Sequence, residues 1–185
     1  LSVIIPIYNE EYFLEASINR LIENDIYEKI ILVNDSSTDN SKTIAEKLCR
    51  KYKKIIYLET ESNLGKGHAL NVGLENVETS HIVIHDADLE YFPEDIVSMF
   101  ELSKKSENSL ILGSRFIGDK ERKNIYKRTY FSNLFLSKFF SLVNLINVSD
   151  VATCYKLLPM RFFEQFNLVE KGFSIEVELL SKYIK

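Results

Sequence analysis

Three carboxylates stand at alternate positions near the middle of the chain, at Asp86, Asp88 and Glu90. They follow the apolar run 82–84, which is typical of a buried strand. In extended backbone, side chains at i, i+2 and i+4 point the same way, so we expect all three to converge on one hard divalent cation. An Asp-x-Asp pair also arises by chance, and a solvated acidic turn is the alternative.

Polar and aromatic residues also follow the first two strand-like runs. Tyr8 ends the run 2–8, and Asp35 follows the run 29–34. The Tyr8 ring can stack on a nucleobase, and the Asp35 oxygens can accept hydrogen bonds from a base or a ribose. Asn9 and Asp39 nearby are also common at helix starts, so a structural role for these segments stays open.

A glycine-rich turn, 63–71, precedes a helical pattern. Such a turn can present backbone N–H groups to a phosphate, with Lys66 as counter-charge. The dinucleotide-binding fingerprint is incomplete because Leu70 stands where its third glycine belongs, and a P-loop is excluded because Gly67 follows Lys66.

One fixed cation, Arg115, follows the fifth strand-like run. Arginine suits bidentate binding of phosphate, whereas a surface ion pair is the ordinary alternative. A metal site together with an arginine on the same edge points to a diphosphate ligand.

Short β-branched runs alternate with helical patterns along the first 116 residues. We expect strands at 2–8, 29–34, 54–59, 81–85 and 109–113, and helices at 11–23, 41–51, 67–77 and 94–103. This order predicts an α/β fold in which a mainly parallel sheet is flanked by helices and ligands collect at the carboxyl ends of the strands. We expect one domain, 1–185.

Composition narrows the class of protein. The chain has 185 residues, of which 45% are hydrophobic and 27% charged, with a net charge of −4. These values predict a globular domain and argue against a nucleic-acid partner. The two cysteines form no CxxC pair, so we expect a reducing compartment. No secretory leader or membrane-spanning run is visible, and we expect more chain to follow Lys185.

Six motifs in order along nearly the whole chain resemble one known family, the family two inverting glycosyltransferases of GT-A (Rossmann-like) fold. The similarity is to the branch of polyprenol-phosphate (dolichol-phosphate) mannosyl- and glucosyltransferases. The motifs that carry it are residues 6–10, 33–39, 63–67, 86–90, 113–116 and 150–156.

The resemblance implies a role for each matching residue. The half 1–116 would bind a GDP- or UDP-sugar donor, and the half 117–185 would face the acceptor. Asp86, Asp88 and Glu90 would hold Mg²⁺ or Mn²⁺, with Asp88 and Arg115 nearest the chemistry; relatives often carry Gln where Glu90 stands. The donor itself would be bound by Pro6, Tyr8, Glu10, Asp35, Lys66, Asp86, Ala87 and Arg115.

The implied reaction is an inverting displacement that moves a hexose onto an acceptor. A polyprenyl phosphate is already nucleophilic at neutral pH and needs no strong base. A hydroxyl of a surface polysaccharide needs one, and Glu176 or Glu178 is the candidate, although the pattern favours exposed helix carboxylates without a catalytic role.

The segment 130–146 bears on the acceptor. Its broad apolar face contrasts with a narrow polar stripe of Asn133, Ser137, Ser141 and Asn144. A basic stretch precedes it, with Lys120, Arg122, Lys123, Lys127 and Arg128. This pattern fits an in-plane membrane helix, and a buried core helix fits equally well.

In the resembled branch this region faces the membrane, which favours a lipid-phosphate acceptor whose phosphate meets Arg128, at the cytoplasmic face of a membrane. A sugar-nucleotide nucleotidyltransferase and a non-enzymatic membrane-peripheral binding module are the competing interpretations. Metal-dependent nucleotide binding separates the module from either enzyme.

Overall fold

The computed structural model describes residues 1–106, 108–118 and 127–185. Within them six strands form one sheet of order β3-β2-β1-β4-β6-β5. The strands are β1 (Ser2–Ile7), β2 (Lys29–Asn34), β3 (Ile55–Glu59), β4 (His81–Ile84), β5 (Ile111–Leu112) and β6 (Lys156–Pro159). The first four are mutually parallel, whereas β6 runs antiparallel to both of its neighbours. The predicted mainly parallel α/β sheet is therefore confirmed, and β6 is a strand that the sequence analysis did not predict.

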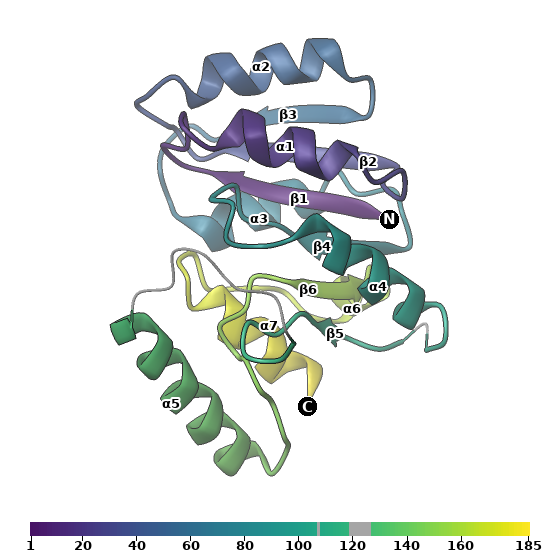
Figure 1. The fold of residues 1–185 in the computed structure, drawn as a ribbon, viewed down its shortest axis with the longest axis vertical. Helices are drawn as coiled ribbons and strands as arrows, with labels where there is room; N and C mark the ends of the chain where they lie inside the picture. Colours follow the sequence, from purple (N-terminus) through teal and green to yellow (C-terminus); the bar gives the residue numbers. More distant parts are fainter. Residues whose placement is uncertain (107, 119–126) are drawn as a thin grey trace.

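Seven helices accompany the described strands. They are α1 (Leu14–Ile22), α2 (Ser41–Lys51), α3 (Lys66–Leu74), α4 (Pro93–Ser103), α5 (Lys127–Asn144), α6 (Arg161–Gln165) and α7 (Ile175–Tyr183). In Figure 1, α1 and α4 lie in front of the sheet and α3 lies behind it. The core is therefore formed on both faces of the sheet, and the central strands β1 and β2 are almost completely buried.

Helix α1 shows how the sequence pattern sets the packing. Leu14, Ile18 and Leu21 recur at helical spacing and are fully buried, whereas Phe13, just outside the helix, is 43% exposed. Burial of one such side chain contributes about 1.5–3 kcal/mol, so this stripe fixes the helix on the sheet.

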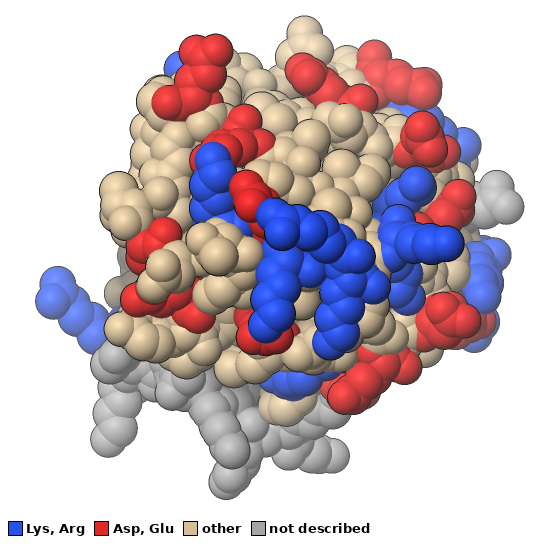
Figure 2. Space-filling view, turned by 90° about the horizontal axis from the view of Figure 1, so that it is seen from above, with Lys and Arg blue, Asp and Glu red and all other residues tan. Residues whose placement is uncertain are grey.

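Helix α2 lies at the top of Figure 1, and the view from above shows Lys and Arg side chains beside acidic ones (Figure 2). Lys42 pairs with Glu59 at 2.6 Å, and Arg50 pairs with Glu46 at 3.1 Å. Neighbouring carboxylates therefore partly neutralise these basic side chains.

Helix α5 exposes most of the apolar face expected for it. Phe131, Phe135, Phe139, Leu142 and Val143 are 56–73% exposed, whereas Phe140 is buried and packs with Val151 and Leu180. Its polar stripe faces the protein, because buried Ser137 accepts a hydrogen bond from the Val151 N–H and Ser141 is bonded to Val148. The buried-core interpretation of this segment is therefore wrong.

No helix among the described residues is long and apolar enough to cross a bilayer. Of the basic residues that precede α5 in the sequence, Lys120, Arg122 and Lys123 lie outside the described residues.

Candidate active site

A cavity of about 420 Å³ opens where the parallel strands end. It is lined by Pro6, Ile7, Tyr8, Glu10, Asp35, Asn63, Gly65, Lys66, Asp86, Ala87, Asp88 and Phe173. Seven of these residues were expected to bind the donor and Asp88 to bind the metal, and they come from the end of β1 and from segments that follow β1, β2, β3 and β4. Parallel pairing of the strands brings these segments together, as the register Ile7 with Asn34 shows.

Tyr8 and Glu10 form the β1 side of this cavity. The Tyr8 ring is 46% exposed, so its face is available to a planar ligand. Burial, and after it the nearby carboxylates of Asp88 and Asp86, raise the pKa of Glu10 to about 7. Negative charge is therefore crowded at this point of the cavity.

Asp35 is buried and holds the glycine-rich turn. Its carboxylate accepts hydrogen bonds from the N–H of Gly65 at 2.6 Å and from the hydroxyl of Thr60 at 2.9 Å. Its side chain is therefore committed to the turn that carries Lys66, although Asp35 also lines the cavity.

The acidic segment after β4 is not extended, contrary to expectation. Leu89 has a positive φ of 64°, and the N–H of Glu90 donates to Asp88 Oδ1 at 3.0 Å, so the backbone turns. The carboxylates of Asp86 and Glu90 consequently meet different cations, Lys66 and Arg115. The geometric argument for three parallel side chains fails because it assumed strand geometry beyond the end of β4.

Lys66 links the acidic segment to α7. Its Nζ lies 2.7 Å from Asp86 Oδ1 and 2.8 Å from Glu176 Oε1, and Glu176 Oε2 lies 2.7 Å from the buried Lys156 Nζ. Burial acts to raise the pKa of Asp86, but the Lys66 ammonium outweighs it, so the pKa lies below its usual value. Three ion pairs thus link four side chains of alternating charge into one charge chain, Asp86–Lys66–Glu176–Lys156.

Glu176 is therefore not an exposed helix carboxylate. It is 4% exposed, holds two ammonium groups and is absent from the described lining of the cavity. Glu178 accepts hydrogen bonds from the N–H groups of Val169 and Glu170. Burial acts to raise the pKa of Glu178, but the hydrogen bonds from Lys182 and from those backbone groups outweigh it and lower the pKa.

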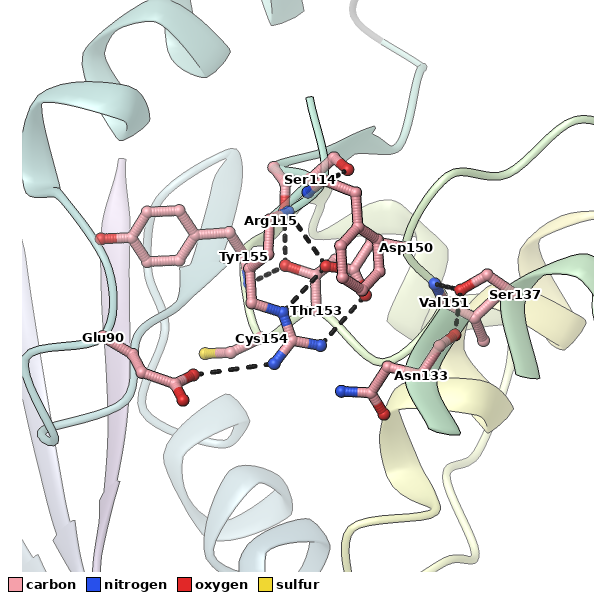
Figure 3. Close-up of polar contacts among 12 residues, drawn as sticks. Glu90, Ser114, Arg115, Asn133, Ser137, Asp150, Val151, Thr153, Cys154 and Tyr155 are labelled. Carbon is pink, nitrogen blue, oxygen red and sulfur yellow. Dashed lines mark hydrogen bonds and ion pairs between the residues drawn. The ribbon is translucent and has the colours of Figure 1, made fainter. Parts of the chain in front are cut away.

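Arg115 is held by Asp150 rather than facing the cavity. Its Nε and one terminal nitrogen lie 2.9 and 3.0 Å from the two Asp150 oxygens, and its other terminal nitrogen lies 3.6 Å from Glu90 Oε2 (Figure 3). This bidentate pair is almost fully buried. Burial acts to lower the pKa of Arg115, but the hydrogen bond to Asp150 and the negative charges of Asp150 and Glu90 together raise it above its usual value.

Two amides of the glycine-rich turn are already bonded within the protein and are not available to a phosphate. The N–H groups of Gly67 and His68 both donate to the carbonyl of Lys171, at 2.6 and 3.2 Å. A Cβ on Gly67 would lie only 2.0 Å from the carbonyl oxygen of Glu170. The glycine therefore serves the close approach of the segment before α7, and Lys66 supplies the cation at this wall.

The chemistry of the acidic side chains fits a divalent cation. No group of three His, Cys, Asp or Glu side chains within the described residues forms a complete metal site. Burial and the neighbouring Asp86 raise the pKa of Asp88, and the Lys66 ammonium offsets this only in part. Asp86 and Asp88 would supply two hard oxygen ligands, and a diphosphate can supply others.

Three residues at or behind this site were missed by sequence reasoning. Phe173, which is 80% exposed, lines the cavity from the segment before α7, while Asp150 and Lys156 hold the charged side chains behind it. Asp150 and Lys156 lie in a quoted motif, but only the antiparallel pairing of β6 shows what they contact. Arg128 is exposed on α5 and is not part of the cavity lining.

The family model for "Glycosyl transferase family 2" matches residues 2–166. A UDP-N-acetylglucosamine–dolichyl-phosphate N-acetylglucosaminyltransferase of Methanococcus voltae is 31% identical over 80% of this chain and 64% of its own. A dolichol-phosphate mannosyltransferase of Pyrococcus furiosus is 29% identical over 98% of this chain and 52% of its own. The chain thus spans less than two thirds of these relatives.

Solved structures share the fold at lower identity. Glucosyl-3-phosphoglycerate synthase from Mycobacterium tuberculosis, in complex with Mn²⁺, UDP and phosphoglyceric acid, has a TM-score of 0.74 and 19% identity. The match covers 97% of this chain and 62% of that one. A mannosyltransferase from Pyrobaculum calidifontis, in complex with GDP-Man and Mn²⁺, has a TM-score of 0.62 and 18% identity, over 89% and 45% of the two chains.

Proposed function

The chain belongs to glycosyl transferase family 2, and from this premise we propose that it transfers a hexose, with inversion, from a GDP- or UDP-sugar to a polyprenyl phosphate. The observation that carries the proposal is the cavity at the carboxyl edge of the sheet, where seven residues expected to bind the donor lie together with Asp88, an expected metal ligand. Ligands of open α/β sheets bind at this edge.

The donor's charged part suits the acidic and basic walls of the cavity. Asp86 and Asp88 would hold Mg²⁺ or Mn²⁺, which when bound would neutralise the departing diphosphate. Lys66 faces the same space and adds a fixed positive charge. Tyr8, half exposed at the β1 side, would contact the nucleobase. Two solved proteins of this fold bind UDP or GDP-Man together with Mn²⁺, which supports this choice of ligand.

A phosphate acceptor agrees with the position of Glu176. A hydroxyl acceptor needs a base that can touch it. Glu176 is buried between two lysines and lies behind the cavity wall, whereas a phosphate monoester attacks without such help. The named activities of the Methanococcus and Pyrococcus relatives on dolichol phosphates support the same class of acceptor.

The exposed apolar face of α5 supports a lipid-linked acceptor. Five large apolar side chains point away from the protein on one helix, and such a face is typical of a helix that lies in a membrane interface. Arg128 is exposed on the first turn of α5 and would meet the acceptor phosphate there. We propose that the enzyme acts at a membrane surface, on its cytoplasmic face.

Thermal unfolding with UDP, GDP, CDP or ADP tests the donor site, each with Mn²⁺ or with EDTA. A ligand at 100 times its dissociation constant stabilises by about 2.7 kcal/mol. We expect one nucleoside diphosphate to raise the melting temperature with Mn²⁺ only, and Asp88→Asn to abolish the shift. If no nucleotide stabilises the wild-type chain, the donor assignment is wrong.

A further inference from the structure

The antiparallel strand β6 carries the segment before it to the acidic end of β4. Val83 pairs with Leu157, so the chain that leads into β6 passes beside the chain that leaves β4. We call residues 150–156 the bracing segment and residues 85–91 the acidic loop. These two segments are about 65 residues apart in sequence, yet they share several buried contacts.

Two hydrogen bonds join the bracing segment to the ends of the acidic loop. The Tyr155 hydroxyl lies 3.0 Å from His85 Nδ1, and the Cys154 N–H donates to the Tyr91 hydroxyl at 2.9 Å. All four residues are at most 2% exposed. The loop is therefore fixed where it begins and where it ends.

Two charge chains join the bracing segment to the carboxylates within the loop. Asp150 holds Arg115, which approaches Glu90 (Figure 3). At the other end of the segment, Lys156 holds Glu176, which holds Lys66 against Asp86.

Each chain starts from a fixed group. Asp150 also accepts the N–H of Arg115, and Lys156 also donates to the carbonyls of Val151 and Thr153 within its own segment.

We propose that the bracing segment positions the acidic loop for the donor, with Asp150, Lys156 and Glu176 as positioning residues that touch neither donor nor metal. The inference rests on the proposed function only for what the loop binds. Asp150, Lys156 and Glu176 are all absent from the described cavity lining, so their positioning effect on a ligand must pass through Arg115, Lys66 or the acidic loop itself.

The physical need for such a device follows from the charges of the loop. Asp86, Asp88, Glu90 and Glu10 crowd together, and the mutual repulsion of Asp86, Asp88 and Glu10 contributes to the raised pKa of Glu10. Two fixed cations, Lys66 beside Asp86 and Arg115 beside Glu90, hold the carboxylates of the loop apart. Partners behind metal ligands typically change affinity or activity 10–100-fold when mutated.

Two variants of opposite charge separate positioning from a simple field effect. Asp150→Asn removes a negative charge behind the site, and Lys156→Met removes a positive one. If the two side chains acted only through their electrostatic field, the anionic nucleoside diphosphate would bind more tightly to Asp150→Asn and more weakly to Lys156→Met. Positioning predicts that both variants bind UDP or GDP with Mn²⁺ at least about tenfold more weakly.

Hydrogen exchange of the loop provides a readout that needs no ligand. The His85 N–H donates to the Ile4 carbonyl and the Glu90 N–H to Asp88. We expect both amides to exchange at least about tenfold faster in the two variants, while amides of β2 keep their rates. Unchanged exchange at His85 and Glu90 would overturn the proposal.

Lys182→Met is the matched control. Lys182 pairs with Glu178 on α7 at 2.8 Å, so this variant also removes a lysine–glutamate pair on the same helix. We expect unchanged affinity and loop exchange; equal effects in the control would show that loosening of α7 suffices and would overturn the proposal.

If either charge variant fails to fold, Tyr155→Phe decides. It removes only the hydroxyl beside His85, and we expect faster exchange in the loop and weaker nucleotide binding. Opposite changes in affinity for Asp150→Asn and Lys156→Met would contradict positioning. If the wild-type chain binds no nucleotide, the proposed function fails, and the exchange result alone decides the inference.

Discussion

The Lys66 ammonium lies 2.7 Å from Asp86 Oδ1, so the first carboxylate of the Asp-x-Asp pair already has a cation beside it. The side chain of Lys66 is only 8% exposed, and Glu176 holds it from the other side. A ligand cation at Asp86 must therefore share this carboxylate with Lys66, and Glu176 gives the ammonium a second anionic partner.

Lys66→Met tests how much the shared cation contributes to stability and to nucleotide binding. It leaves Asp86 and Glu176 without their shared cation, and breaking a buried pair by removing one partner is strongly destabilising. We expect a loss on the order of 3 kcal/mol in the free energy of unfolding, measured with urea, and weaker binding of nucleoside diphosphates. Lys47→Met, at an exposed pair with Glu15, is the control, with a change within about 0.5 kcal/mol. If Lys66→Met were as stable as the wild type, the four charged side chains Asp86, Lys66, Glu176 and Lys156 would not act as a structural unit.

The raised pKa of Glu10 predicts a pH dependence of stability. Because the folded state holds this proton up to about pH 7 and the unfolded chain releases it near 4.5, stability falls as pH rises between these values. We expect Glu10→Gln to remove a decrease on the order of 1–2 kcal/mol, once solvent screening is allowed for. Urea midpoints from pH 4 to 8 measure it, with Glu23→Gln as the surface control. Parallel curves for wild type and Glu10→Gln would refute the assignment.

The half of the fold in which strands β1 to β4 alternate with helices was predictable, because the hydrophobic patterns of these elements are local in the sequence. Each of the first four buried runs gave a strand within about one residue of its expected bounds, and the residues after them met at one edge as parallel pairing requires. Polar residue types that follow β1, β2 and β4 therefore predicted the cavity without any knowledge of loop geometry.

Strand β6 and the charge chains were not predictable in the same way. Lys156 and Pro159 bracket only two leucines, so the segment shows no strand period, and a lysine gives no sign of complete burial. The roles of Lys66, Arg115 and Glu176 depend on partners 20 to 110 residues away. The turn at Leu89 was missed because a positive φ at leucine is rare and has no residue signature.

Gly67→Ala tests why the turn before α3 is rich in glycine. The new Cβ would lie 2.0 Å from the Glu170 carbonyl oxygen, so the backbone before α7 must move. We expect a loss of about 1–3 kcal/mol in the free energy of unfolding and faster proteolysis after Lys171. Gly172→Ala is the matched control, because no atom lies within 4 Å of its added Cβ. Equal stabilities of the two variants would show that the close approach is not needed.

The exposed face of α5 gives the last prediction. Phe135 and Leu142 are both 73% exposed, so replacing both with Asp removes apolar contact area and adds negative charge while disturbing little of the core. If this face enters an anionic membrane surface, the double variant co-sediments with phosphatidylserine-containing vesicles at least about tenfold less than wild type, with an unchanged melting temperature. Leu102→Asp, on the half-exposed surface of α4, should bind vesicles like wild type. Equal sedimentation of all three proteins would contradict membrane docking and would favour a protein partner for the exposed face of α5, because an exposed apolar face commonly marks an interaction site.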